Sequence, residues 1–193
     1  ALLRLHLPQD PKWLRQVHGA RAVLADGLAG TKEADASVAR NLGTVCTVMI
    51  ADCLPVLLCD ARARVVGIAH AGWRGLVSGV VENTVAAMDV APEEIMAYLG
   101  PAIGPDAFEV GADVRDAFVA ADPSAGAAFA PFREGKWLAD LFELARQRLA
   151  QSGVHRVYGG GLCTYRDPAR FYSYRRDKTT GRMAAFIWLE PVA

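Results

Sequence analysis

The chain has 193 residues, of which 52% are hydrophobic and 22% charged, and its formal net charge is zero. This length and composition predict one folded domain with a buried core and exclude extensive disorder. A neutral chain without an apolar run of ~18 residues gives no reason to expect nucleic acid or a membrane as a partner. Its four cysteines form no disulfide framework, so we expect reduced thiols in a cytoplasmic protein.

The amino-terminal part is predicted to be mostly extended. The chain starts at Ala1 without a turn or cap before its first apolar residues, so we expect an upstream segment to precede the single domain 1–193. Residues 22–25 are a short strand candidate, and 45–51 form a nearly unbroken apolar run that predicts a central strand. Between them, 31–41 is predicted to hold one or two helical turns.

Two apolar runs in the middle of the chain, 54–59 and 65–69, predict neighbouring buried strands. The charged break at 60–64 is typical of the turn between them. Cys53 opens the first run and His70 closes the second. If the two strands pair antiparallel, a thiol and an imidazole meet at one edge of the sheet.

The rest of the chain mixes helices and strands. Residues 72–88 predict one helix, because apolar side chains recur there at helical spacing. A second helix is expected at 111–121, and the clearest apolar stripe predicts a third over 137–151. These elements favour an α+β domain in which helices cover mixed β-sheets. Further strands are expected at 95–99, 154–158, 160–164 and close to the carboxyl terminus.

His18, Cys53 and His70 form a candidate set of three zinc ligands. Each histidine is followed by small residues, and glycine permits the close approach of another group. One thiolate and two imidazoles leave the fourth position of a tetrahedral zinc to water or substrate, as in catalytic zinc sites. Two competing interpretations use the same atoms: Cys53 as a nucleophile with His70 as its base and an acid such as Asp52 as the orienting group, or simple packing in a binding module.

Arginines indicate what such a site binds. Arg74 lies at the amino end of the helix predicted over 72–88, where backbone N–H groups favour an anion. Arg175, Arg176 and Arg182 lie in a tyrosine-rich tail. Arginine binds phosphate in a bidentate fork, and aromatic faces suit a planar base. This pattern predicts a pocket for phosphate and a nucleoside, with a solvated surface face as the competing interpretation.

Several motifs resemble the YfiH-like family in the right order, from about Trp13 to the end: Q-V-H-G, A-D-C-L-P-V-L-L, H-A-G-W-R-G, G-P-A-I-G-P-x-x-F-E-V-G and F-Y-S-Y-R-R-D-K-T-T-G-R-M-A. Members of this family were described first as polyphenol oxidases (laccase-domain proteins) and later as purine nucleoside phosphorylases. The resemblance implies a layered α/β/β/α fold, similar to that of a bacterial toxin deamidase. It also implies a zinc enzyme that cleaves adenosine, inosine, guanosine and methylthioadenosine with phosphate and deaminates adenosine.

The resemblance also carries over the metal ligands, which fall on His18, Cys53 and His70. Copper is the less favoured metal, because a blue-copper oxidase needs several copper sites and more than the four histidines present. The sequence also leaves open a thiol hydrolase or peptidoglycan-editing factor, and a non-enzymatic scaffold. An upstream T-T-R-x-G-G-V-S motif of the family does not occur in this chain.

Besides Cys53, the candidate catalytic residues fall into two groups. Arg74 and Arg175 are predicted to bind phosphate, while Asp52, Glu109 and Asp177 are candidates for proton transfer. The H-x-E with P-C-x-x-C signature of zinc deaminases is missing, so adenosine deamination would use an independent solution. Both a monomer and a homodimer are compatible with the sequence. The predicted catalytic set is Cys53, Asp52, Arg74 and Arg175.

Overall fold

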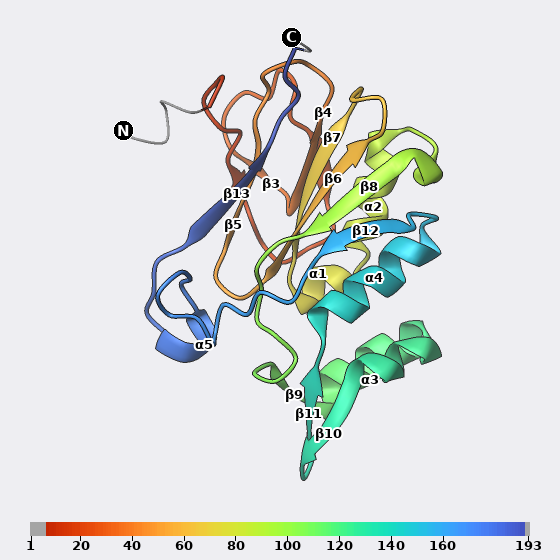
Figure 1. The fold of residues 1–193 in the computed structure, drawn as a ribbon, viewed down its shortest axis with the longest axis vertical. Coiled ribbons are helices and arrows are strands. Elements are labelled where there is room, and N and C mark those ends of the chain that lie inside the picture. Colours follow the sequence, from red (N-terminus) through yellow and green to blue (C-terminus); the bar gives the residue numbers. More distant parts are fainter. Residues whose placement is uncertain (1–6, 192–193) are drawn as a thin grey trace.

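The computed structural model describes residues 7–191 and shows the α+β fold expected from the sequence (Figure 1). A six-stranded mixed sheet lies at its centre, with the strand order β12-β8-β6-β7-β4-β2. The expectation about the start of the chain at Ala1 lies outside the described residues. The strands of this sheet are β2 (Ala22–Leu24), β4 (Ala36–Ala39), β6 (Leu54–Asp60), β7 (Val66–Ala71), β8 (Ile95–Leu99) and β12 (Arg156–Gly159).

The two middle strands, β6 and β7, form the hairpin that the apolar runs predict. They pair antiparallel, with Leu54 opposite Ala71 and Pro55 opposite His70. Every residue of β7 is buried, because this strand is covered on both of its faces. The prediction that Cys53 and His70 meet at one edge of the sheet is therefore confirmed.

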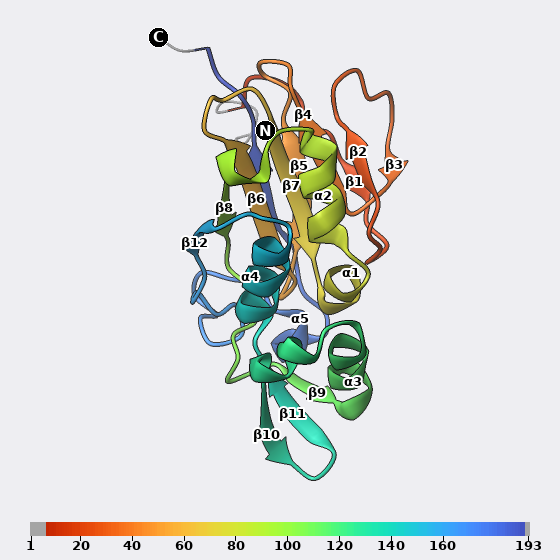
Figure 2. The ribbon, with the colours of Figure 1, turned by 90° about the vertical axis from the view of Figure 1, so that its right-hand side faces the viewer.

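Helices pack against one face of the sheet and a second small sheet against the other (Figures 1 and 2). Apolar residues on the two faces form two separate core clusters. No helix among residues 7–191 is long and apolar enough to cross a membrane. The helical face carries α1 (Trp73–Val77), α2 (Val80–Met88), η2 (Pro92–Glu94) and α4 (Leu141–Gln151), and the opposite face carries the antiparallel pair β5 (Cys46–Ile50) and β13 (Met183–Ile187).

A small three-stranded unit extends from one end of the molecule, beyond α1 and α4 (Figure 2). Short elements complete the rim of the fold, and β1 pairs with β3 in parallel. The three-stranded unit comprises β9 (Glu109–Gly111), α3 (Ala112–Ala121), η3 (Pro123–Ala128), β10 (Phe129–Arg133) and β11 (Lys136–Ala139). The short elements elsewhere are β1 (Leu14–Arg15), β3 (Lys32–Glu33) and α5 (Tyr174–Asp177).

Two predicted helices have different bounds in the structure. The single helix expected over 72–88 is broken into α1 and α2, because Gly79 adopts a left-handed conformation with φ of 91°. The helix expected over 137–151 begins only after Asp140, whose side chain accepts hydrogen bonds from the next turn. Residues 137 and 138 belong to β11 instead, so their apolar side chains pack as part of a strand.

Three other secondary-structure predictions differ from the structure. The helical turns expected over 31–41 are absent from the structure, which has β3 and β4 there. All four residues of β4 are buried, so its sequence lacks the polar–apolar alternation of a half-exposed strand. The strand expected over 45–51 exists as β5, but it pairs with β13 rather than lying in the central sheet. In 160–164, Cys163 makes only an isolated bridge with Ala102.

We predict that Asp140→Ala lowers the free energy of unfolding by about 1 kcal/mol, the usual effect of losing an N-cap side chain. The Asp140 carboxylate accepts the backbone N–H groups of Phe142 and Glu143 at 2.9 and 3.1 Å. Urea denaturation measures the change. Glu134→Ala, at an exposed position in the adjacent β-turn, is the control and should leave stability unchanged. Equal stability of the two variants would contradict the start of α4 at this cap.

Candidate metal centre

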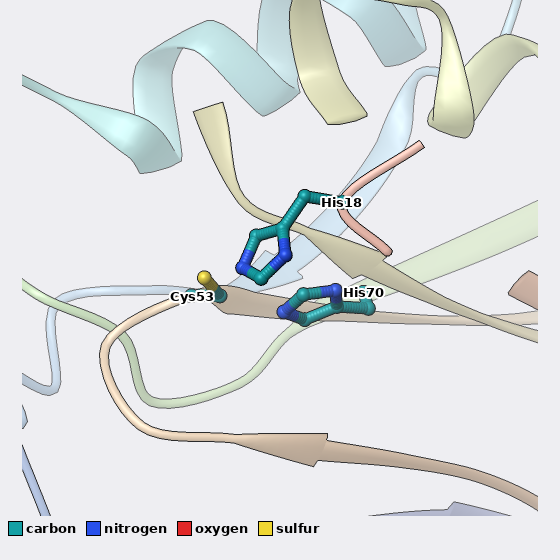
Figure 3. Close-up of side chains that lie close together, drawn as sticks. All are labelled: His18, Cys53 and His70. Carbon is teal, nitrogen blue, oxygen red and sulfur yellow. The ribbon is translucent and has the colours of Figure 1, made fainter. Parts of the chain in front are cut away.

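His18, Cys53 and His70 come from three segments and converge at one end of the central hairpin (Figure 3). Cys53 directly precedes β6, and His70 lies on β7 opposite Pro55. His18 follows β1, and its ring packs beside that of His70, so that both rings lie near the thiol of Cys53 (Figure 3). One donor atom from each residue lies within 4.8 Å of the others. The structure thus brings together all three residues predicted as metal ligands.

Asp35 ties two of these donors together, although it is not among the residues that the sequence predicts. Its side chain is fully buried. Oδ1 accepts hydrogen bonds from Nδ1 of His70 at 2.8 Å and from the backbone N–H of His18 at 2.9 Å. Oδ2 accepts the N–H groups of Val17 and Gly19 at 3.1 and 2.8 Å. One carboxylate therefore holds both the ring of His70 and the turn that carries His18.

The backbone at His18 is left-handed, with φ of 60°, a conformation that residues other than glycine adopt at a cost. The hydrogen bonds from this turn to Asp35 stabilise the conformation. The sequence signal for Asp35 is weak: it is an acid between alanines just before a strand of small residues. The one indication is energetic: burying an acid among small apolar residues is costly unless hydrogen-bond donors surround it.

The three donors shift one another's proton affinities. Burial raises the pKa of the Cys53 thiol, but hydrogen bonds with His18 and His70 outweigh burial and bring this pKa to about 6. Burial lowers the pKa of His70, whereas its bonds with Asp35 and Cys53 raise it to about 9. Burial likewise opposes ionisation of Asp35, yet His70 and the backbone N–H groups hold the pKa of Asp35 below its usual value. The two imidazoles therefore favour the thiolate of Cys53, the form that binds metals and attacks electrophiles.

The donor set fits a zinc ion. One soft thiolate and two imidazoles are common zinc ligands, and three protein ligands leave a position for water or substrate. The ring centroids of His18 and His70 lie 4.8 Å apart at an angle of 72°. Within residues 7–191, this is the one group of three or more His, Cys, Asp and Glu side chains close enough to share an ion.

Gly72 leaves the space that the thiol occupies. A Cβ atom at this position would lie 2.9 Å from Sγ of Cys53 and 3.4 Å from Cδ2 of His18. Gly72 is also the residue that precedes α1. The first glycine of the H-A-G-W-R-G motif is therefore explained by packing against two of the donors.

The three donors lie on the wall of a cavity of about 920 Å³. Arg74 stacks its guanidinium on the ring of Trp73 at 4.4 Å, and Arg175 lies 5.3 Å from the ring centroid of Phe108. The predicted phosphate ligands Arg74 and Arg175 thus reach the same space as the metal donors. The wall also includes Arg15, Arg182, Met49, Ile103, Leu141 and Tyr174.

Asp52 lines this cavity, but its hydrogen bonds point to a role in holding the main chain. Its Oδ1 accepts the hydroxyl of Thr164 at 2.6 Å, and its Oδ2 accepts the N–H of Arg175 at 2.6 Å. These bonds join the turn before Cys53 to the start of α5. The carboxylate that orients His70 is that of Asp35, not the Asp52 named in the nucleophile interpretation.

The remaining predicted residues lie in ion pairs outside the cavity wall. Glu109 accepts Nη2 of Arg133 at 2.6 Å, and Asp177 accepts Nε of Arg176 at 2.9 Å. Arg176 also donates to the carbonyl oxygen of Thr164 at 2.8 Å. These contacts give Arg176 a structural role in the tail and do not place either acid against the metal donors.

Comparisons with known proteins identify a family and several similar proteins. The family model described as multi-copper polyphenol oxidoreductase laccase matches residues 2–190. The purine nucleoside phosphorylase YfiH of Escherichia coli (strain K12) is 56% identical over 185 residues, which cover 95% of this chain and 76% of that protein. A purine nucleoside phosphorylase of Pseudomonas aeruginosa is 54% identical over 181 residues, covering 93% and 74%.

Solved structures show the same fold. A protein of Neisseria meningitidis superposes with a TM-score of 0.94 at 53% identity, over 98% of this chain and 78% of that one. The YfiH protein of Bacillus licheniformis superposes with a TM-score of 0.90 at 30% identity, over 97% and 77%.

We predict that Asp52→Ala loosens the start of α5. The variant leaves the buried Thr164 hydroxyl and the Arg175 N–H without their acceptor, which costs about 1–3 kcal/mol per unpaired group. Hydrogen exchange of the Arg175 amide should accelerate, and urea denaturation should show lower stability. Asp167→Ala, which removes a surface partner of Arg170, is the control. Unchanged exchange at Arg175 in Asp52→Ala would show that this contact does not hold the tail.

Proposed function

The chain belongs to the multi-copper polyphenol oxidoreductase laccase family, and we propose that it is a purine nucleoside phosphorylase with zinc held by His18, Cys53 and His70. One observation carries the proposal: three metal-type donors and several arginines line the same cavity. Relatives that are 54–56% identical are named purine nucleoside phosphorylases, which supports an enzyme of this kind.

The proposed substrates are phosphate and the nucleosides adenosine, inosine, guanosine and methylthioadenosine. In phosphorolysis, phosphate replaces the purine at the anomeric carbon of the sugar. We assign phosphate binding to Arg74 and Arg175, because a guanidinium binds phosphate bidentately and fixes its position for attack. Asp52 holds the main chain of Arg175 beside the cavity, which supports the assignment of the second arginine. The aromatic and aliphatic wall suits the purine ring.

The departing purine needs a proton or a hydrogen-bond donor. Of the three acids predicted for proton transfer, Asp52 lines the cavity. Both of its oxygens accept hydrogen bonds, one from Thr164 and one from Arg175. A proton-transfer role for Asp52 stays a prediction beside its structural one.

We also propose that the same site deaminates adenosine to inosine. Zinc bound by the three donors would supply Lewis acidity, which activates water for hydrolytic reactions. The thiolate of Cys53 provides the one negative ligand, and the two imidazoles keep the centre positively charged. Asp35 fixes the orientation of His70.

The four described cysteines are free, which supports our proposal of a reducing, cytoplasmic location.

Two observations favour different candidate functions. The family description names copper and polyphenol oxidation, but the described residues contain a single donor group, whereas multi-copper oxidation requires several metal centres. Cys53, His70 and Asp35 also have the order of a nucleophile, its base and an orienting acid. Such a thiol hydrolase has no need of His18, so the third donor supports the metal centre.

Metal analysis together with a nucleoside assay tests the proposal. The purified protein should contain about one zinc per chain and should release free base and ribose 1-phosphate from inosine only when phosphate is present. Copper retention with oxidation of phenols would establish the oxidase instead. A metal-free protein that forms a covalent adduct at Cys53 during turnover would establish the hydrolase.

We predict that Cys53→Ala abolishes zinc binding and lowers turnover by more than the ~10–100-fold typical of outer-shell variants. The reason is that the variant removes the only anionic ligand. Zinc content and ribose 1-phosphate formation are the measurements. Cys59→Ala is the matched control, because Cys59 lies on β6, the strand that Cys53 directly precedes, but outside the cavity wall. Full turnover in Cys53→Ala would refute the metal-based mechanism.

We further predict that Arg74→Gln and Arg175→Gln each raise the KM for phosphate by roughly 10–100-fold, the effect of losing a charge-assisted hydrogen bond. The KM for inosine should change much less. Initial rates with varied phosphate give both constants. Arg62→Gln, at an exposed arginine that pairs with Glu94, is the control. An equal change in both KM values would assign these arginines to general cavity structure.

A further inference from the structure

Asp35 holds parts of two donor segments that are far apart in the sequence. Besides the side-chain bonds to His18 and His70, its backbone carbonyl accepts the N–H of His70 at 2.7 Å. The ring and the main chain of His70 are therefore both fixed by this one residue. The carboxylate is fully buried and is not part of the cavity wall that the three donors line.

We propose that Asp35 is the positioning residue of the metal centre, a role that rests on the proposed zinc site. It sets His70 with Nδ1–H donated to the carboxylate and with Nε2 left for the metal. It also sets His18 by accepting the three consecutive N–H groups of the turn 17–19. The two imidazoles then keep their geometry relative to Cys53 before any ion arrives.

The hydrogen-bond chemistry of imidazole supports the first part of this role. A neutral histidine has one N–H donor and one lone pair, and the partner of one nitrogen decides which nitrogen binds metal. At His70 the Nδ1 atom lies 2.8 Å from Oδ1 of Asp35. Nε2 is therefore the atom that faces Cys53 and His18, the arrangement visible in Figure 3, and a metal ion would replace the proton on it.

The backbone conformation of the turn supports the second part. His18 is left-handed, and the N–H groups of Val17, His18 and Gly19 all point to one carboxylate. An asparagine at position 35 would place an NH₂ group where one oxygen now accepts these hydrogens. Donor would then face donor, so the turn and its imidazole would shift.

Asp60 provides a matched comparison at the other end of β6. It is buried as Asp35 is, and it accepts the N–H groups of Arg64 and Val65 at 2.6 and 3.0 Å and Nε of Arg64 at 2.7 Å. Asp60 thus organises a turn without any contact to the donors. A purely structural role for Asp35 predicts that D35N and D60N behave alike.

The test compares wild type, D35N and D60N in zinc affinity, measured by competition with a chromogenic chelator. We expect D35N to bind zinc about 10–100-fold more weakly, with D60N equal to wild type even where both variants lose thermal stability. In the cobalt-substituted proteins, the d–d and thiolate-to-cobalt bands should change in D35N alone. Zinc affinity and cobalt spectra of D35N that match those of D60N would overturn the inference.

A measurement on the wild-type protein decides the question if D35N does not fold. Nitrogen NMR of histidine-labelled, zinc-loaded protein should show His70 with a hydrogen-bonded Nδ1–H and a coordinated Nε2. Coordination through Nδ1 would overturn the role of Asp35 while leaving the zinc centre intact. A wild-type chain that binds no zinc would instead overturn the proposed metal centre and this inference together.

Discussion

The antiparallel register of β6 and β7 is the constraint on which the site depends. Because side chains alternate along a strand, a shift of one residue would turn His70 to the opposite face of the sheet. The observed register places His70 opposite Pro55 and so beside the thiol of Cys53. Packing on both faces keeps that register, because a slip would move the side chains of β7 into the wrong one of the two core clusters. The geometry of the donors is thus a consequence of how the core packs.

Two buried carboxylates connect this hairpin end to remote parts of the chain. Asp35 binds the turn before it in sequence and the ring on β7, and Asp52 binds the tail across 112 and 123 residues. Their hydrogen bonds supply the order that a loop-built site otherwise lacks. Contacts among the donors and Asp35 also set the charges, because the imidazoles stabilise the thiolate and Asp35 stabilises the protonated form of His70. A neutral chain can therefore contain a strongly polar centre within an apolar fold.

The sequence predicted the hairpin and the convergence of Cys53 and His70, because two apolar runs and a charged break specify local pairing. The family followed from motif resemblance, which the comparisons confirm. Asp35 was not predictable in the same way, since its role depends on a contact across 35 residues with no periodic signal. Two predicted helix bounds were wrong because a single residue sets each of them. Gly79 separates α1 from α2, and Asp140 caps the start of α4. Apolar spacing alone does not distinguish strand β11 from the first turn of a helix.

The sequence positions of the site residues have a consequence for how the protein is made. The three metal donors and Asp35 all lie between residues 18 and 70, whereas Arg175 lies close to the carboxyl end of the chain. During synthesis, earlier segments become available to fold first. In a nascent chain, the three proposed zinc ligands and Asp35 would therefore leave the ribosome well before Arg175, one of the two arginines proposed to bind phosphate. The proposed metal centre would thus be complete in the nascent chain before the proposed phosphate-binding residues are.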